Sequence, residues 1–553
     1  MDVIRDVAAP MRDGTMLRAD VHRPPGPGPF PVLLRRTPYG KQAFAGLASE
    51  LAARGYLVVV QDIRGRHASD GAWVWAFAET AQRVEAEDGF DTVEWAARLP
   101  DADGRVGAFG HSYDAWASWR LAAERPPSLR GILTAGITAR LLDVTHGIFD
   151  LGRRLEWCYL EAAEARRRAG GRGGPTSYAE AERDWAEVER GKWLWFTPLD
   201  DIPSHVFSLV TPQLKRFLRE VDRELWALDE IHPLVEVPVC VVTGWWDRFV
   251  HGVDHFTGMR RNGPAATRDA HRLIVGPWSH DPDGYGEPFP ALDPGPAGKL
   301  SFAQIVDDFF APLLRGRPRD DGPPVRVFEL GGNRWRAEPD WPPRGASPTP
   351  LYLRGGGRAN TAFGDGRLSR DLPGDEPSDR YTYDPRDPVM SLMGADSQLA
   401  PTDQAPNDGR ADKLVYRTEP LEAGLRVAGP VSAVLWAASS APQTDWVARL
   451  IREDAAGRAV NLAEGVLRAA MEPGVPRELH IRLTPACVAF LPGERIRLDV
   501  TSSDFPNHDR NHNTGADFWS DRELRPARQE IFHAAARPSR LVLPIRPGGD
   551  LDG

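Results

Sequence analysis

One stretch of the sequence decides the fold: Val106-Gly107-Ala108-Phe109-Gly110-His111-Ser112-Tyr113-Asp114-Ala115-Trp116. Its apolar first part is typical of a buried strand, and a helical pattern begins at Trp116. A strand, a sharp turn carrying a serine, and a helix form the context of a nucleophile elbow, in which small neighbours let the hydroxyl project above the sheet. The match to Gly-x-Ser-x-Gly is incomplete, because Asp114 stands where the second glycine belongs. The stretch predicts a nucleophilic serine; the alternative is a serine that only caps the helix.

Apolar runs and helical patterns alternate on both sides of this stretch. Six short runs read as buried strands, at residues 31–34, 56–60, 106–109, 129–133, 237–243 and 273–276. Residues 44–54 and 92–98 have helical spacing. Because strands that alternate with helices form parallel sheets, the sequence predicts an α/β fold with helices on the faces of the sheet. The long gap before residue 237 predicts an insertion between two strands.

The 553 residues exceed the size of one ordinary domain. We predict an α/β-hydrolase core in two parts, 1–140 and 235–345, with a helical cap inserted at 141–234. The alternative for the insertion is a separate helical domain that touches no functional site. Residues 346–553 contain short β-branched runs between turns and no evident helix. This pattern predicts an all-β sandwich of the jelly-roll type.

The composition argues against several classes of partner. The formal net charge of −10 argues against nucleic acid as the main partner. The sequence has no run of about 18 apolar residues that could form a transmembrane helix, and its first residues lack a signal-peptide pattern. Three cysteines, far apart in the chain, fit a reducing cytoplasm and exclude a cysteine-built zinc site. We expect a cytoplasmic protein without a membrane partner, and the sequence leaves open whether identical chains associate.

Two later loops carry the residue types that a serine nucleophile needs. Asp247 follows the predicted strand at 237–243, and His280 follows the one at 273–276. In open α/β sheets ligands bind beyond the carboxyl ends of the strands, and the order serine, acid, histidine is that of α/β-hydrolases. We therefore predict Ser112 as nucleophile, His280 as base and Asp247 as the acid that orients the base.

Other titratable residues near these loops are weaker candidates. Four histidines are expected to have packing, structural or surface roles: His111, His251, His255 and His271. Three aspartates could also orient a base: Asp254, Asp281 and Asp283. Asp247, in a tight aromatic turn, is better placed than these three. Only Asp281 is kept as an alternative to Asp247 as the acid.

Acyl transfer also requires donors for the developing oxyanion. The backbone N–H of Tyr113, the residue after the nucleophile, is the expected first donor. The loop after the first predicted strand has no Gly-Gly run, but Tyr39 in it could offer a hydroxyl. The alternative for Tyr39 is a tyrosine packed in a Pro-Gly turn.

Motifs in a fixed order extend nearly from end to end of the chain. They occupy residues 11–14, 37–39, 61–66, 110–113, 244–247, 276–280, 440–446, 502–506 and 511–515. In these motifs the chain resembles the cocaine esterase family of bacterial serine hydrolases, which is related to X-prolyl dipeptidyl peptidases and α-amino acid ester hydrolases. The resemblance implies a hydrolase core, a helical cap and a jelly roll. It also implies a triad at Ser112, Asp247 and His280 and an oxyanion tyrosine at Tyr39.

The chain departs from the family pattern at two places. Ala115 stands where the family elbow usually has glycine, and the extra methyl puts the reaction rate in doubt. The amino-ester hydrolases of the family bind a substrate ammonium with carboxylates just after the triad acid. Residues 248–250 contain none, and an unpaired ammonium would be costly to desolvate there. We therefore do not expect that specificity.

Aromatic residues instead suggest a pocket for an apolar or aromatic acyl group. Beside the triad motifs lie Trp245, Trp246, Phe249 and Trp278, and the insertion contributes Phe149 and Trp157 as lid contacts. The aromatic stretch 73–77 is either a further wall or core. Arg248 is expected at the surface, with an anionic substrate group as its alternative partner.

The sequence thus predicts a serine esterase that cleaves an ester, or an amide, through an acyl-enzyme. Its partner would be a small-molecule substrate, and neither a metal nor an organic cofactor is expected. The alternatives are an X-prolyl or other dipeptidyl peptidase, an acyltransferase or cyclase with the same triad, and a catalytically silent binding protein.

Overall fold

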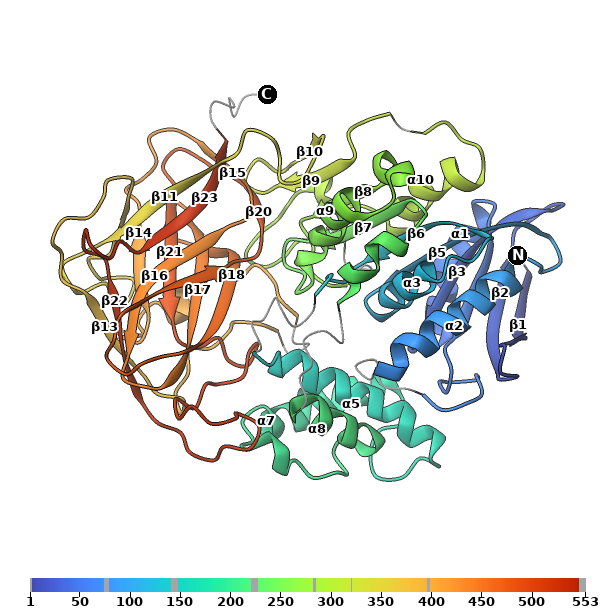
Figure 1. Ribbon diagram of the computed structural model, residues 1–553, viewed down its shortest axis with the longest axis horizontal. Coiled ribbons are helices and arrows are strands. Elements are labelled where there is room, and N and C mark those ends of the chain that lie inside the picture. The colour runs from blue at the N-terminus through green and yellow to red at the C-terminus, as the bar shows by residue number, and fades with distance from the viewer. Residues whose placement is uncertain are drawn as a thin grey trace.

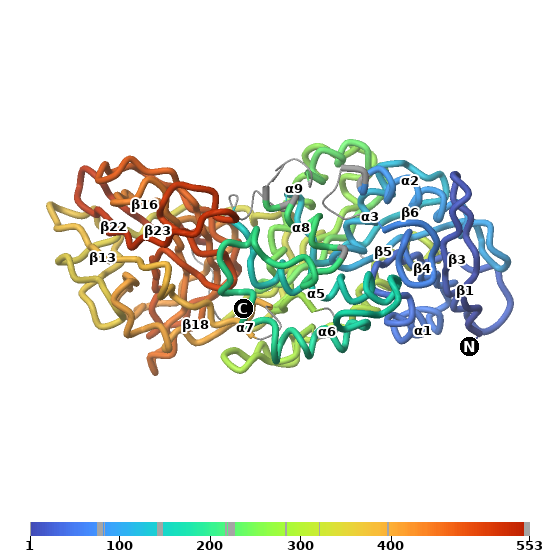
Figure 2. Tube along the Cα trace, turned by 90° about the horizontal axis from the view of Figure 1, so that it is seen from below, coloured from blue at the N-terminus to red at the C-terminus, as the bar shows by residue number. Residues whose placement is uncertain are grey.

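Two large β-sheets organise the chain (Figure 1). The computed structural model describes residues 2–73, 79–140, 148–219, 227–281, 285–319, 321–394 and 398–546, and the structural statements below concern these residues. The first sheet lies at one end of an elongated molecule and the second sheet at the other. Figure 2 shows the helical insertion alongside the middle. The chain therefore consists of an α/β half, an insertion and an all-β half.

The first sheet has ten strands in the order β1-β2-β4-β3-β5-β6-β7-β8-β9-β10. The strands are β1 (Asp2–Pro10), β2 (Met16–Arg23), β3 (Phe30–Thr37), β4 (Leu57–Asp62), β5 (Ala102–His111), β6 (Leu129–Ala135), β7 (Val239–Gly244), β8 (Arg272–Gly276), β9 (Val325–Glu329) and β10 (Arg334–Glu338). The neighbours from β4 to β9 in this order pair in parallel. The six predicted strands are confirmed as β3 to β8. The outer strands β1, β2, β9 and β10 were not predicted, because charged residues interrupt their apolar residues.

Helices cover both faces of this sheet. One face packs against α1 (Ala45–Ala53) and α10 (Phe302–Leu314), and the other against α2 (Glu79–Ala96), α3 (Tyr113–Ala123) and α9 (Val253–Asn262). Side chains alternate between the faces of a strand, so Leu33 of β3 joins the core with α1, and Val32 and Leu34 join the core with α3. The predicted helix at 44–54 is confirmed as α1. The helical pattern at 92–98 is only the end of α2, whose first turns are largely polar.

The insertion between β6 and β7 is helical in its described part. It contains α5 (Leu151–Arg168), α6 (Tyr178–Asp184), α7 (Arg190–Trp193) and α8 (Thr211–Arg219). Residues 141–147 and 220–226 lie outside the described residues, so the ends of the insertion are not placed. The insertion touches both halves: Glu161 of α5 pairs with Arg66 at 2.6 Å, and the N–H of Gly152 donates to the carbonyl of Pro506 at 2.7 Å. No described helix is long and apolar enough to cross a bilayer.

The second sheet has thirteen strands. They are β11 (Ser347–Arg354), β12 (Arg367–Ser369), β13 (Asp379–Tyr383), β14 (Leu414–Arg417), β15 (Leu425–Gly429), β16 (Ser432–Ser439), β17 (Gln443–Glu453), β18 (Ala459–Ala470), β19 (Arg477–Arg482), β20 (Ala486–Phe490), β21 (Arg495–Thr501), β22 (Ala527–Phe532) and β23 (Arg540–Arg546). The apolar run at 427–435, which reads as one strand in the sequence, is divided between β15 and β16. The division falls at Gly429, with φ 136°, and at Pro430, which has no N–H to donate.

The two halves are joined by a short strand-like contact. The N–H of Leu330, just after β9, donates to the carbonyl of Cys487 at 3.0 Å, and the N–H of Ala489 donates back to Leu330 at 2.8 Å. Gly331 follows with φ 79°, and a methyl on it would lie 2.1 Å from the carbonyl oxygen of Ala489. Only glycine fits this close backbone approach.

Candidate active site

Ser112 occupies a strained turn between β5 and α3. Its φ and ψ are 58° and −120°, an unusual conformation for a residue with a side chain, and its N–H donates to the carbonyl of Ala135 at 2.8 Å. A methyl on Gly110 would lie 2.3 Å from the backbone carbon of Asp114, so the turn needs glycine there. The Ser112 side chain accepts no capping hydrogen bond from α3. The helix-cap interpretation is therefore wrong, and the geometry is that of an elbow.

A buried ion pair lies beside the turn of Ser112. Asp114 pairs with Arg35 of β3 at 2.6 Å, and the guanidinium of Arg35 lies 3.5 Å from the ring centre of Phe44. Burial raises the pKa of Asp114 to about 6, with Arg35 acting in the opposite direction. This pair is not among the residues predicted from the sequence. A signal was present, because Arg35 and Arg36 interrupt an otherwise apolar strand.

The loops after β7 and β8 bring an aspartate and a histidine together. His280 Nδ1 and Asp247 Oδ1 are 2.9 Å apart, and both side chains are almost fully buried. Asp247 Oδ1 also accepts the N–H of Phe249 at 2.8 Å. The loops are tied to each other because the N–H of Trp246 donates to the carbonyl of Trp278 at 3.0 Å. A carboxylate held in this way can orient the imidazole and fix its tautomer.

Gly136 links the elbow to the histidine. It follows Ala135, whose carbonyl accepts the N–H of Ser112, and its φ is 59°. A methyl on Gly136 would lie 2.6 Å from Nε2 of His111 and 3.0 Å from Cε1 of His280. Among the described residues the Ser112 hydroxyl has no hydrogen-bond partner, and such contacts commonly tighten only when substrate is bound. The carboxyl ends of β5, β6, β7 and β8 thus gather the three predicted side chains.

His111 lies against the proposed base. The ring centres of His111 and His280 are 4.3 Å apart. Burial lowers the pKa of His111 well below its usual value, and His280 lowers it further. Nitrogen or oxygen atoms of His111, Asp247 and His280 lie within 4.8 Å of one another, and among the described residues this is the one group of metal-ligating type. Two of its members already hydrogen-bond to each other, which suits proton transfer.

The other candidate bases and acids lie elsewhere. His251, His255 and His271 are buried; His255 stacks on Trp119 at 4.2 Å, and His271 Nδ1 accepts the N–H of Val239 at 3.2 Å. These positions confirm structural roles. Asp254 pairs with Arg482 at 2.8 Å. Asp281 is exposed, and the carboxylate that contacts Nδ1 of His280 is that of Asp247. Asp283 lies outside the described residues.

The two predicted oxyanion donors belong to the first residue of α3 and to the loop after β3. The N–H of Tyr113 has no backbone partner among the described residues, while its side chain is buried with the hydroxyl 3.3 Å from Glu85. Tyr39 follows β3, and its ring meets that of Tyr178 of α6 edge-on at 5.9 Å. Burial and nearby Glu161 raise the pKa of Tyr39, so its hydroxyl keeps its proton, and Trp157 hydrogen-bonds to it.

Of the aromatic residues predicted for the pocket, some lie beside the site and others at the contact with the all-β half. Phe249 has its ring centre 5.1 Å from that of His280, and Trp157 reaches Tyr39, so both lie at the site. Phe149 stacks on Phe518 at 6.1 Å, at the contact with the all-β half. Trp246 donates its indole N–H to the carbonyl of Asn461 at 3.2 Å, also in that half.

Two predicted pocket residues belong to the core instead. Trp278 stacks on Tyr285 at 4.0 Å and joins the cluster with α1 and α10, on one face of the sheet. Trp245 donates its indole N–H to the carbonyl of Phe328 at 2.7 Å. Neither has more than 2% of its surface exposed, so the pocket prediction is wrong for both. Short loops do not dictate where such large side chains point.

The expectation of a surface Arg248 is also wrong. Its side chain is only 6% exposed and lies 3.7 Å from Asp150, at the contact between the insertion and the all-β half. Asp150 in turn lies 3.3 Å from His508. Of the aromatic stretch 73–77, only Trp73 is described, and Arg66 lies 4.5 Å from its ring centre.

Comparison with known proteins identifies the same two-part organisation. Residues 13–282 match the X-Pro dipeptidyl-peptidase (S15) family, and residues 319–542 match the C-terminal non-catalytic domain of X-Pro dipeptidyl-peptidase. An aminopeptidase from a Thaumarchaeota archaeon and an α-amino acid ester hydrolase share the fold, with TM-scores of 0.78 and 0.75. Both are 24% identical in sequence, and the alignments cover 99% of this chain and 97% of theirs.

The cocaine esterase of a Rhodococcus strain is 34% identical to this chain, and the alignment covers 98% of each protein. Similarity at this level along the entire length shows common descent and a shared type of chemistry. The first half is thus a hydrolase domain of the S15 type, and the second is an all-β domain. The chain belongs to the cocaine esterase family of serine hydrolases, within the X-Pro dipeptidyl-peptidase (S15) group, and is a carboxylic ester hydrolase.

Proposed function

We propose that the protein cleaves an ester, or an amide, of an apolar or aromatic acyl group through an acyl-enzyme formed on Ser112. His280 is the general base and acid, and Asp247 orients it. One observation carries this proposal: the buried 2.9 Å contact between His280 Nδ1 and Asp247 Oδ1, beside the strained turn of Ser112. The substrate is a small molecule, and the proposal needs neither metal nor organic cofactor.

The reaction takes place in two similar halves. Nε2 of His280 accepts the proton of the Ser112 hydroxyl while Oγ bonds to the carbonyl carbon, and the carbonyl becomes an oxyanion. When the oxyanion collapses, the bond to the leaving alcohol breaks and His280 returns the proton to that alcohol. Water then attacks the acyl-enzyme with the same proton transfers and releases the acid. Asp247 keeps the proton on Nδ1 throughout, so that Nε2 is free to act as the base.

The N–H of Tyr113 and the hydroxyl of Tyr39 are the proposed donors to the oxyanion. A tyrosine hydroxyl is protonated at neutral pH, which is the form that can donate, and the raised pKa of Tyr39 extends that form to higher pH. Trp157 donates to the same oxygen and leaves the tyrosine proton available.

We propose further that the insertion at 141–234 is a cap over the site and that residues 346–553 form a jelly roll. The contacts of α5 with the site support the cap, because Trp157 reaches Tyr39 and Glu161 pairs with Arg66. The largely antiparallel pairing of the thirteen strands supports the jelly roll. The core would then comprise 1–140 and 235–345.

The acyl pocket is proposed between Phe249 and Trp157. Both are large apolar side chains beside the proposed base or oxyanion donor, and such groups commonly line small-molecule pockets. Residues 248–250 offer no carboxylate to a substrate ammonium, and the nearby Asp150 already faces Arg248 and His508. This argues against a peptidase that binds a free N-terminus.

Cytoplasmic location remains a prediction from the three buried free cysteines.

The acyl-enzyme is tested with 4-nitrophenyl esters of benzoate and acetate. We expect a burst of one nitrophenolate per chain, followed by a slower steady rate. A fluorophosphonate should label Ser112 and abolish the burst. Product analysis with added alcohol separates a hydrolase from an acyltransferase. A folded protein that shows no burst of nitrophenolate and takes up no label would support the catalytically silent binding protein instead.

Replacing Tyr39 with phenylalanine removes one oxyanion donor and keeps the ring. We expect kcat to fall by about a hundredfold to a thousandfold, with KM within about threefold. The matched control is Tyr178→Phe, which removes the hydroxyl of the ring packed against Tyr39. If Tyr39→Phe leaves kcat unchanged, Tyr39 is a packing residue.

Replacing Gly136 with alanine should disturb the base. The positive φ costs about 1–2 kcal/mol for a residue with a side chain, and the methyl would meet His111 and His280. We expect kcat to fall by about a hundredfold, because a small displacement of a reacting group has this effect.

Gly316→Ala is the control, because Gly316 has φ 66° and nothing within 4 Å of an added methyl. It should lose only the free energy of unfolding that the positive φ costs, measured by urea denaturation, and retain activity. Equal activity in the two variants would show that Gly136 does not position the base.

A further inference from the structure

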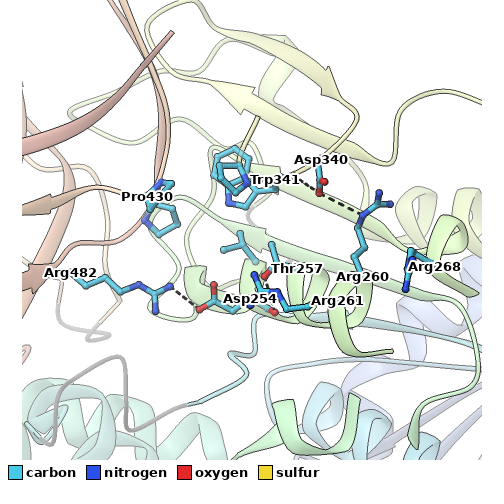
Figure 3. Close-up of a pocket in the computed structure, with 12 residues that line it drawn as sticks. Asp254, Thr257, Arg260, Arg261, Arg268, Asp340, Trp341, Pro430 and Arg482 are labelled. Atoms are coloured by element: carbon cyan, nitrogen blue, oxygen red, sulfur yellow. Dashed lines mark hydrogen bonds and ion pairs between the residues drawn. The ribbon is translucent and has the colours of Figure 1, made fainter. Parts of the chain in front are cut away.

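A second hollow lies at the junction of the two halves, lined by none of the residues proposed for catalysis (Figure 3). It has a volume of about 460 Å³, within the range of small-molecule sites. One wall is a face of α9 and the 3-10 helix Ala265–Ala270 after it, a second is the segment with Asp340 and Trp341 that leads into the second sheet, and the third belongs to the all-β half. The hollow is therefore built from three separate parts of the chain.

Four arginines line this hollow: Arg260, Arg261, Arg268 and Arg482. Two of them have acidic partners, since Arg482 lies 2.8 Å from Asp254 and Arg260 lies 3.5 Å from Asp340. Within the described part of the chain, Arg261 and Arg268 form no ion pair, and both are exposed. The hollow thus carries two positive charges that nothing described neutralises, on a chain whose formal net charge is −10.

Apart from Thr257, the remaining lining is apolar. Trp341 and Pro342 line the hollow from the segment that leads into the second sheet, and Pro430 and Pro485 line it from the all-β half. Trp341 is only 5% exposed and packs on Trp245, so it is held in place. Proline and indole rings offer flat contact surfaces, and guanidinium groups both bind carboxylates and stack on planar groups.

We propose that this hollow binds an organic carboxylate with a flat apolar body. Arg261 and Arg268 would supply the positive charge that attracts the carboxylate, and Pro342 and Pro430, with the exposed part of Trp341, would contact the body. Ester hydrolysis releases a carboxylate, so that the enzyme's own reaction supplies this class of ligand. A ligand held between α9 and the all-β half would also tie the two halves together.

The test uses 2-naphthoate as the probe, with binding measured by calorimetry and thermal unfolding. We expect 2-naphthoate to bind and to raise Tm, and the variant R261S/R268S to lower its affinity at least fivefold. The matched control R98S/R370S removes two exposed arginines that have no ion pair within the described residues. It should bind 2-naphthoate within twofold of the unmodified protein.

Two further probes separate charge from shape. Inorganic phosphate should bind more weakly than 2-naphthoate, and the neutral 2-naphthalenemethanol should not distinguish R261S/R268S from the control. Equal affinity of the two double variants for 2-naphthoate would overturn the proposal and assign its binding to another site, such as the acyl pocket. Phosphate binding as tight as that of 2-naphthoate would overturn the apolar part of the site.

Discussion

Replacing Ser112 with alanine is expected to lower kcat by about a million-fold and to leave the fold intact. The hydroxyl is the only atom lost, and it makes no hydrogen bond among the described residues that would stabilise the folded chain. Without it His280 has no nucleophile to activate, and removal of a triad nucleophile has an effect of this size in other serine hydrolases. The measurement is kcat for 4-nitrophenyl esters, together with far-UV circular dichroism and the urea midpoint.

Ser118→Ala is the matched control on the same helix. Its hydroxyl is buried and donates to the backbone carbonyl of Asp114 at 2.8 Å, so the change costs about 1 kcal/mol of stability. Its kcat should stay within about threefold, and it should still take up the fluorophosphonate. Substantial esterase activity in Ser112→Ala, free of contaminating enzyme, would remove Ser112 from the mechanism.

The grouping of the three proposed triad residues could be predicted from the sequence because each has a local signal. Ser112 directly follows the strand β5, and Asp247 and His280 lie in the short loops just after β7 and β8. Parallel strands place their carboxyl ends at one edge of the sheet, so residues far apart in the chain meet there. Local pattern and topology therefore suffice for these three residues, without knowledge of the packing.

Side-chain direction could not be predicted in the same way. Trp278 is only two residues from His280, yet its indole packs on Tyr285 in the core. Arg248 follows Asp247 directly, yet it is buried against Asp150, which comes from the insertion. Both positions depend on elements distant in the sequence. The role of Gly136 was also hidden, because its need for a small residue arises from His111 and His280 across the sheet edge.

Replacing Asp247 with asparagine is expected to lower kcat by about ten thousand-fold at neutral pH. Asparagine has the same shape, so the N–H of Phe249 can still donate to the side-chain oxygen. The N–H of Phe249 and Nδ1 of His280 contact the same atom, Oδ1 of Asp247. With an amide oxygen at that position, the negative charge that stabilises the imidazolium is lost. With the amide nitrogen there, the side chain donates to Nδ1 and favours the tautomer with its proton on Nε2. The imidazole then cannot accept the proton of Ser112. KM should change little, because Asp247 is buried and does not touch the substrate.

Asp281→Asn separates Asp247 from the alternative acid. Asp281 adjoins His280 in the chain and is exposed, whereas Asp247 is the carboxylate 2.9 Å from Nδ1 of the imidazole. We expect Asp281→Asn to retain kcat within about threefold. A large loss in Asp281→Asn with a small one in Asp247→Asn would reverse the assignment of the acid. The predicted result would assign the orientation of the base to Asp247, because both substitutions remove a carboxylate near the same histidine and the 2.9 Å contact with Nδ1 belongs to Asp247.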